Sequence, residues 1–126
     1  MKIDILAIGA HPDDVELSCA ATLAKEISRG KTVGILDLTR GELGTRGTAA
    51  IRDEEGKRAA EILGAQFRHN LELPDGFLTN DRDSQLEIVK IIRKYRPDIV
   101  LCNAIDDRHP DHAKASKLAS GACFLS

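Results

Sequence analysis

The sequence predicts an α/β fold, a Rossmann-like three-layer sandwich in which helices cover both faces of a mostly parallel sheet. Four short apolar runs alternate with four segments of helical periodicity, and the short links between them are typical of βαβ units. The chain has 126 residues, of which 42% are hydrophobic and 30% are charged. That size and composition predict a single globular domain over residues 1–126.

Each predicted element is bounded by a turn or helix-ending signal. The predicted strands are 2–9, 32–39, 65–73 and 98–103. The predicted helices are 15–30, 51–63, 84–95 and 113–122. In the Rossmann-like strand order 3-2-1-4, the first and fourth strands are neighbours, and ligands bind beside the carboxyl ends of such strands. A long Gly- and Thr-rich loop at 40–50 without periodicity is of the kind that often carries function.

Composition excludes several classes of function. The formal net charge is -2, aromatic residues make up 3% and there is no Trp, which argues against a nucleic-acid partner. The apolar run at the N-terminus is too short for a membrane span or signal peptide. Three widely spaced cysteines, Cys19, Cys102 and Cys123, lie in hydrophobic stretches and are interpreted as buried thiols. We therefore expect a cytoplasmic protein without a membrane partner.

Two histidine motifs carry the chemistry. His11-Pro12-Asp13-Asp14 directly follows the first strand, and His109-Pro110-Asp111-His112 follows the fourth. Because neighbouring strands lie about 4.8 Å apart, side chains from both loops can converge on one ion. Imidazole and carboxylate suit Zn²⁺, and a catalytic zinc has three protein ligands and one open position. His11, Asp14 and His112 fit that count.

The remaining polar residues of the two motifs suggest catalytic roles. Asp13 would lie beside the metal and accept a proton from a bound water. His109 would face the same cavity and, when protonated, stabilise an oxyanion or protonate a leaving amine, unless it is a surface loop histidine. Asp111 either orients an imidazole or caps the helix that follows.

These segments together resemble a known family. AHPDD follows the first strand, RGELGT lies in the long loop, RDEE opens the second helix and RHPDH follows the fourth strand. The chain is similar to the PIG-L or LmbE-like zinc-dependent N-acetylglucosamine deacetylases. Within that family its layout is most similar to N-acetylglucosaminyl-malate deacetylases of bacillithiol biosynthesis. The resemblance covers essentially the whole chain.

The resemblance implies an activity and further site residues. It implies a zinc-dependent hydrolase that removes acetyl from an N-acetylglucosaminyl substrate, with zinc on His11, Asp14 and His112. Arg52 and Arg108 correspond to arginines that lie near the substrate in family members, where a guanidinium suits hydroxyl or carboxylate recognition. Glu55 either buttresses the loop or lies on a solvated helix face. A homo-oligomer is expected by resemblance alone.

The chain departs from the family in length. Family members continue past the second histidine motif, whereas this sequence ends in a predicted apolar helix at GACFLS. We therefore expect the C-terminal part of the domain to be lacking. The alternative function is then a truncated metal-binding module without full catalytic activity. A nucleotide-binding domain is disfavoured because GAHPDD replaces the GxGxxG motif after the first strand.

Overall fold

Strands and helices alternate along the whole chain in the computed structural model, which describes residues 1–126. The strands are β1 (Ile5–Gly9), β2 (Val33–Thr39), β3 (Phe67–Leu73) and β4 (Ile99–Leu101). The helices are α1 (Asp14–Ser28), α2 (Ala49–Leu63), α3 (Arg82–Tyr95) and α4 (Pro110–Leu125). All eight elements predicted from the sequence are present.

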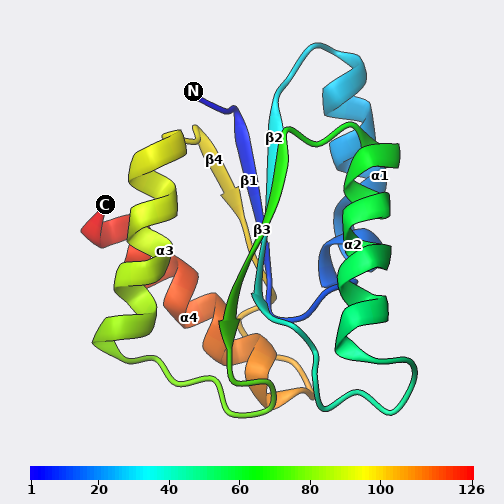
Figure 1. Ribbon diagram of the computed structural model, residues 1–126. Coiled ribbons are helices and arrows are strands. Elements are labelled where there is room, and N and C mark those ends of the chain that lie inside the picture. The colour runs from blue at the N-terminus through cyan, green and yellow to red at the C-terminus, as the bar shows by residue number, and fades with distance from the viewer.

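The strands form one parallel sheet in the order β3-β2-β1-β4. Helices α1 and α2 cover one face, and α3 and α4 cover the other (Figure 1). The predicted three-layer α/β fold and its strand order are therefore confirmed. This order places the carboxyl ends of β1 and β4 side by side, with Ala7 of β1 opposite Leu101 of β4.

The core lies on both sides of the central strands. All five residues of β1 and all seven of β2 are buried, as expected of a parallel sheet covered on both faces. Alternate residues serve the two faces: Leu6 and Ile8 pack in the cluster under α3 and α4, whereas Ile5 and Ala7 pack in the cluster under α1. Strand β1 is consequently packed between two neighbouring strands and two apolar clusters.

Two helix starts place polar side chains near the carboxyl end of the sheet. The Thr48 hydroxyl caps α2 by accepting from the backbone N–H of Ile51. Helix α2 therefore begins at Ala49, two residues before the predicted start. His109 caps α4 by accepting from the Asp111 N–H, with Pro110 at the first helical position. Helix α4 therefore begins at Pro110, earlier than the predicted residue 113, and the second histidine motif forms its N-cap and first turn.

The exposure of several apolar residues differs from expectation. Cys102 and Cys123 are exposed and Cys19 is half-buried, so the prediction of buried thiols is wrong. Cys102 follows β4, which pairs only with β1 and is partly open at the sheet edge. Ile62 of α2 is also exposed, because that helix packs through Gly56 and Ala60. None of the four helices combines the length and the apolar character needed to cross a bilayer.

Candidate metal centre and active site

A tight turn follows β1 and begins the site. The backbone N–H of Asp14 donates to the His11 carbonyl (3.2 Å), and Asp13 has φ 93° and ψ −22°. These values describe a type II turn with Pro12 in its second position. A positive φ costs a residue with a Cβ about 1–2 kcal/mol, so surrounding contacts must maintain this conformation.

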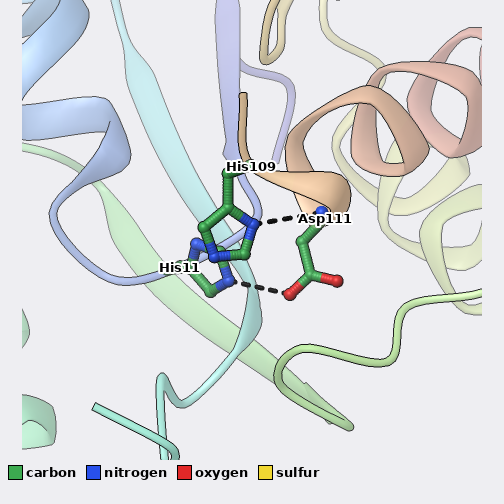
Figure 2. A group of neighbouring side chains, drawn as sticks. All are labelled: His11, His109 and Asp111. Carbon is green, nitrogen blue, oxygen red and sulfur yellow. Dashed lines mark hydrogen bonds and ion pairs between the residues drawn. The ribbon is translucent and has the colours of Figure 1, made fainter. Parts of the chain in front are cut away.

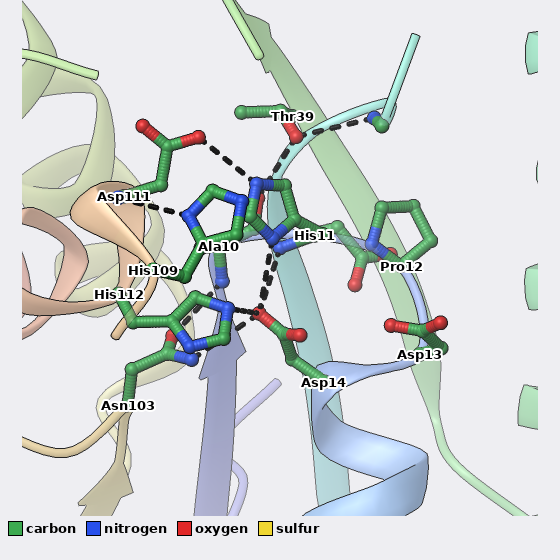
Figure 3. Close-up of polar contacts among 12 residues, drawn as sticks. Ala10, His11, Pro12, Asp13, Asp14, Thr39, Asn103, His109, Asp111 and His112 are labelled. Carbon is green, nitrogen blue, oxygen red and sulfur yellow. Dashed lines mark hydrogen bonds and ion pairs between the residues drawn. The ribbon is translucent and has the colours of Figure 1, made fainter. Parts of the chain in front are cut away.

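The predicted ligand atoms meet around the carboxylate of Asp14. Its Oδ2 lies 3.5 Å from His11 Nδ1 and 3.3 Å from His112 Nε2. Figure 3 shows the two imidazoles converging on this oxygen from the ends of β1 and α4. Ligand atoms from the three residues lie within 4.8 Å of one another. The structure thus brings together the three residues that the sequence predicted as ligands.

This arrangement fits a tetrahedral cation. Zinc bonds to nitrogen and oxygen are about 2.0–2.1 Å long, so neighbouring tetrahedral ligands lie about 3.3 Å apart. The two separations from Asp14 Oδ2 match that spacing. The donor set of two imidazoles and one carboxylate also suits zinc.

The ring nitrogens facing away from this point contact carboxylates. His11 Nε2 lies 2.9 Å from Asp111 Oδ2 and 3.0 Å from Asp75 Oδ1. His112 Nδ1 lies 2.8 Å from Asp107 Oδ2. A histidine that donates one ring N–H to a carboxylate presents the other nitrogen to a metal. Both imidazoles are therefore oriented for coordination through the atoms near Asp14.

A second group of possible ligands consists of His11, His109 and Asp111, but its atoms already have partners. The fully buried Asp111 accepts from the backbone N–H of Gly76 and Leu78 as well as from the His11 ring. Figure 2 shows the Asp111 N–H donating to His109 while the Asp111 carboxylate faces His11. Of the two roles left open for Asp111, the structure favours orienting an imidazole, because His109 caps the helix.

Electrostatics at the turn reflect these contacts. Burial favours the neutral ring of His11, but hydrogen bonds to Asp14 and Asp111 raise its pKa to about 9. Burial opposes ionisation of Asp14, yet the hydrogen bonds from His11 and Asn103 lower its pKa below the ordinary value. The ionised Asp14 and Asp111 therefore lie next to a protonated His11 ring. A cation bound at this point would replace the proton of that ring.

Asp13 and His109 line the same cavity beside the ligands. Its volume is about 320 Å³, and its walls include His11, Arg52, Leu43 and Gly76. Partial burial raises the pKa of Asp13, and Arg52 opposes that shift. His109 Nδ1 accepts a backbone N–H, so the ring proton is on Nε2 and the ring is a neutral donor. The surface-loop alternative for His109 is not supported by this placement.

The two predicted substrate arginines differ in placement. Arg52, in the first turn of α2, lines the cavity and also contacts the turn after β1. Arg108 is exposed on the loop before α4 and does not line this cavity. Glu55 is exposed on α2 in an adjoining cavity with Arg46.

Three functional neighbours were not predicted from the sequence. Asn103 donates to Asp14 Oδ2 (3.2 Å) and accepts from the Ala10 N–H (2.9 Å). Asp75 and Asp107 contact the two ligand histidines. Asp75 had a usable signal, because it lies in the Pro-Asp-Gly turn that follows β3 at the same end of the sheet. No local pattern distinguished Asp107 or Asn103.

A larger cavity of about 380 Å³ lies between α2 and β3. Its buried charges are paired within the protein: Arg68 Nε lies 2.6 Å from Asp37, and Arg68 Nη1 lies 3.0 Å from Glu16. This ion-pair cluster joins α1, β2 and β3. We assign it a structural role.

Comparisons of sequence and structure identify relatives of this chain. The chain is 40% identical over 124 residues to diacetylchitobiose deacetylase of Thermococcus kodakarensis, covering 90% of this chain and 46% of the relative. Its structure resembles a conserved protein of Thermus thermophilus, with a TM-score of 0.93 and 46% identity over 98% of this chain and 56% of that one. It also resembles 4-carboxy-2-hydroxymuconate hydratase of Pseudomonas putida, with a TM-score of 0.87 and 28% identity over 99% and 57% of the two chains.

The chain spans about half the length of these relatives. The PIG-L family, described as GlcNAc-PI de-N-acetylase, matches residues 6–123 and so includes both histidine motifs. Because that match runs across nearly the whole sequence, this chain belongs to the PIG-L family.

Proposed function

We propose that this chain forms the metal-binding half of a zinc-dependent N-deacetylase, a hydrolase that releases acetate from an N-acetylglucosaminyl substrate. One observation carries the proposal. The ligand atoms of His11, Asp14 and His112 lie within 4.8 Å of one another, and both imidazoles are at tetrahedral spacing from Asp14 Oδ2. Asp13 lines the cavity beside His11. A metal next to a carboxylate base is an arrangement that catalyses amide hydrolysis.

The chain's own residues divide the chemistry between them. A zinc ion on the three ligands would polarise the acetamide carbonyl and acidify a water molecule. Asp13 takes the proton from the attacking water. His109 donates its Nε2–H to the oxygen that becomes negatively charged. Asp13, which then carries the proton taken from water, protonates the departing amine; His109 could do so only with both ring nitrogens protonated. Both residues line the cavity from which the amine leaves.

The substrate class is supported by the family and by the relatives. The family description and the name of the Thermococcus kodakarensis relative both specify removal of acetyl from an acetylated amino sugar. N-acetylglucosaminyl-malate remains our more specific proposal from the sequence motifs. The family resemblance implies Arg52 and Arg108 as neighbours of the substrate, and Arg52 lines the cavity. The cytoplasmic location and the homo-oligomeric state stay predictions.

A second candidate is hydration of a carbon–carbon double bond. The structural relative from Pseudomonas putida is named a hydratase, and a site with a metal and a base that activates water can also serve such a reaction. A third candidate is a metal-binding module without turnover, because the chain spans about half the length of its relatives. Substrate assays separate these candidates.

The test measures acetate release from N-acetylglucosaminyl-malate, N,N′-diacetylchitobiose and N-acetylglucosamine. The chain is first stripped of metal with a chelator and then reloaded with Zn²⁺, and its zinc content is determined in parallel. Zinc-dependent release supports the proposal and ranks the substrates. Stoichiometric zinc with no release from any of them overturns it in favour of the module, and hydration of an unsaturated dicarboxylate overturns it in favour of the hydratase.

A further inference from the structure

Arg52 donates two hydrogen bonds to backbone carbonyls beside the candidate site. It lies in the first turn of α2, and its side chain is 20% exposed. Nη2 donates to the carbonyl of Pro12 (2.8 Å), and Nη1 donates to the carbonyl of Gly41 (2.9 Å). Nη2 also lies 3.7 Å from Asp13 Oδ2. One guanidinium thus joins the turn after β1 to the long loop after β2.

The bond to Pro12 acts on the strained part of the turn. The carbonyl of Pro12 belongs to the peptide that joins Pro12 to Asp13, and rotation of this peptide converts a type II turn into a type I turn. That rotation would change φ of Asp13 from its present 93° to a negative value and move its side chain. The hydrogen bond from Arg52 holds the carbonyl in the type II orientation.

The long loop closes tightly on the same side chain. A Cβ added at Gly41 would clash with Arg52 Nη1, and one added at Gly44 would lie 3.0 Å from it. Gly41 also has φ 65°, and its carbonyl accepts from the Gly44 N–H (3.0 Å). The absence of a Cβ at both glycines lets the guanidinium fit between the loop and the turn. In this position the guanidinium has little freedom to move toward a ligand.

We propose that Arg52 is a positioning residue that holds the Asp13 carboxylate in its catalytic place by fixing the Pro12–Asp13 peptide. This role differs from the substrate contact that the family resemblance implies for Arg52. The inference rests on the proposed function, because Asp13 is the base of that reaction. A positioning role predicts that kcat depends on Arg52 while KM does not.

The test is a double-mutant cycle between Arg52→Lys and Asp13→Asn, with Arg58→Lys as the matched control. Arg58 is an exposed arginine on the same helix. A lysine has a single ammonium and cannot donate to both carbonyls in the guanidinium geometry. We expect Arg52→Lys to lower kcat about 10- to 100-fold, with unchanged KM and zinc content. In the Asp13→Asn background the same change should cost less than about twofold, because the base is already absent.

A substrate-binding role gives a different pattern. Arg52→Lys would then raise KM with kcat unchanged, and the loss would be equal in the wild-type and Asp13→Asn backgrounds. That pattern overturns the inference. Arg58→Lys should match the wild type in kcat and KM.

A structural readout keeps the inference testable without turnover. In crystal structures, Asp13 should leave its positive φ in Arg52→Lys and keep it in Arg58→Lys. An unchanged Asp13 in Arg52→Lys overturns the inference. If Arg52→Lys does not fold, Arg52→Gln replaces it in both assays. Absence of acetate release by the wild type would overturn the proposed function alone, since the crystal structures would still decide the role of Arg52.

Discussion

The two halves of the candidate metal site differ in how firmly the fold holds them. The half after β1 continues from the centre of the sheet, where every residue is buried. The half after β4 follows a three-residue strand at the sheet edge and a loop, 104–108, that is exposed throughout. Both halves carry a ligand histidine, so their surroundings can be compared directly.

The surroundings of the two histidines show what that difference means. His11 is 10% exposed and lies between Asp14 on one ring nitrogen and the buried pair Asp75 and Asp111 on the other. His112 is 19% exposed, and its second nitrogen contacts the more exposed Asp107. The ring of His11 is therefore oriented by buried carboxylates. The ring of His112 relies on the more exposed carboxylate of Asp107, and salt screens that interaction more strongly.

Removing each ligand histidine should give the largest effect and separate the two halves. His11→Ala and His112→Ala should both lose the metal and the metal-dependent turnover. Only His11→Ala should also destabilise the metal-free fold, by about 1–3 kcal/mol, because buried Asp111 loses a donor. Zinc analysis after dialysis and urea unfolding with a chelator measure these effects. Stoichiometric zinc in His112→Ala would refute the ligand assignment, and equal stability losses would refute the comparison.

Changing the catalytic side chains should leave the metal in place. Asp13→Asn should retain zinc and lower activity by about 10² or more, a typical contribution of a general base. His109→Gln should also retain zinc and lose activity, by less than Asp13→Asn, since a glutamine amide can still donate a hydrogen bond. Steady-state kinetics and metal analysis on both variants check this order. Near-normal turnover of Asp13→Asn would eliminate its assigned role.

The carboxylates behind the two histidines offer a finer comparison. Asp111→Asn should weaken zinc binding about 10- to 100-fold, the usual effect of losing such a partner. Asp107→Asn should weaken it less, and its effect should shrink as salt concentration rises. Competition with a chromogenic zinc chelator at low and high salt measures both. Equal, salt-independent losses would show that exposure does not distinguish the two partners.

The fold could be predicted because its signals are local. Runs such as residues 32–39 are apolar on both faces, and a parallel sheet covered by helices buries both faces. The ends of elements were less predictable where tertiary contacts decide them. The fourth strand was predicted to include Asn103 but ends at Leu101, since the side chain of Asn103 binds Ala10 and Asp14 instead. The start of α4 was also predicted too late, because histidine is a weak sequence signal for an N-cap. Pro110 is the stronger signal, since proline favours the first position of a helix.

The metal ligands could be predicted because two motifs and one strand order place them together. Of their partners, only Asp111 was anticipated, as one of its two predicted roles. Asp75, Asp107 and Asn103 could not be predicted, because each contact depends on how a loop folds back. Asp75 reaches His11 only because the turn after β3 packs against the first turn of α4, where Asp111 accepts from Gly76 and Leu78. The Pro-Asp-Gly signal places Asp75 at the site end of the sheet, but it does not indicate which side chain Asp75 contacts. Long-range loop packing is thus where the sequence pattern is least informative.

The smallest expected effect concerns the opposite end of β1, where no catalytic group lies. Hydrogen bonds from the Thr32 backbone and hydroxyl hold the pKa of Asp4 below its ordinary value. A lowered carboxyl pKa stabilises the fold above the unfolded pKa near 3.8, and this contribution disappears as pH falls through the folded value. Asp4→Asn should therefore lower Tm slightly at pH 6 and converge with the wild type in strong acid. Acetate release at pH 7 should not change, because the site lies at the carboxyl ends of the strands, far along β1 from Asp4. A loss of zinc or of turnover in Asp4→Asn would show that the two ends of β1 are coupled.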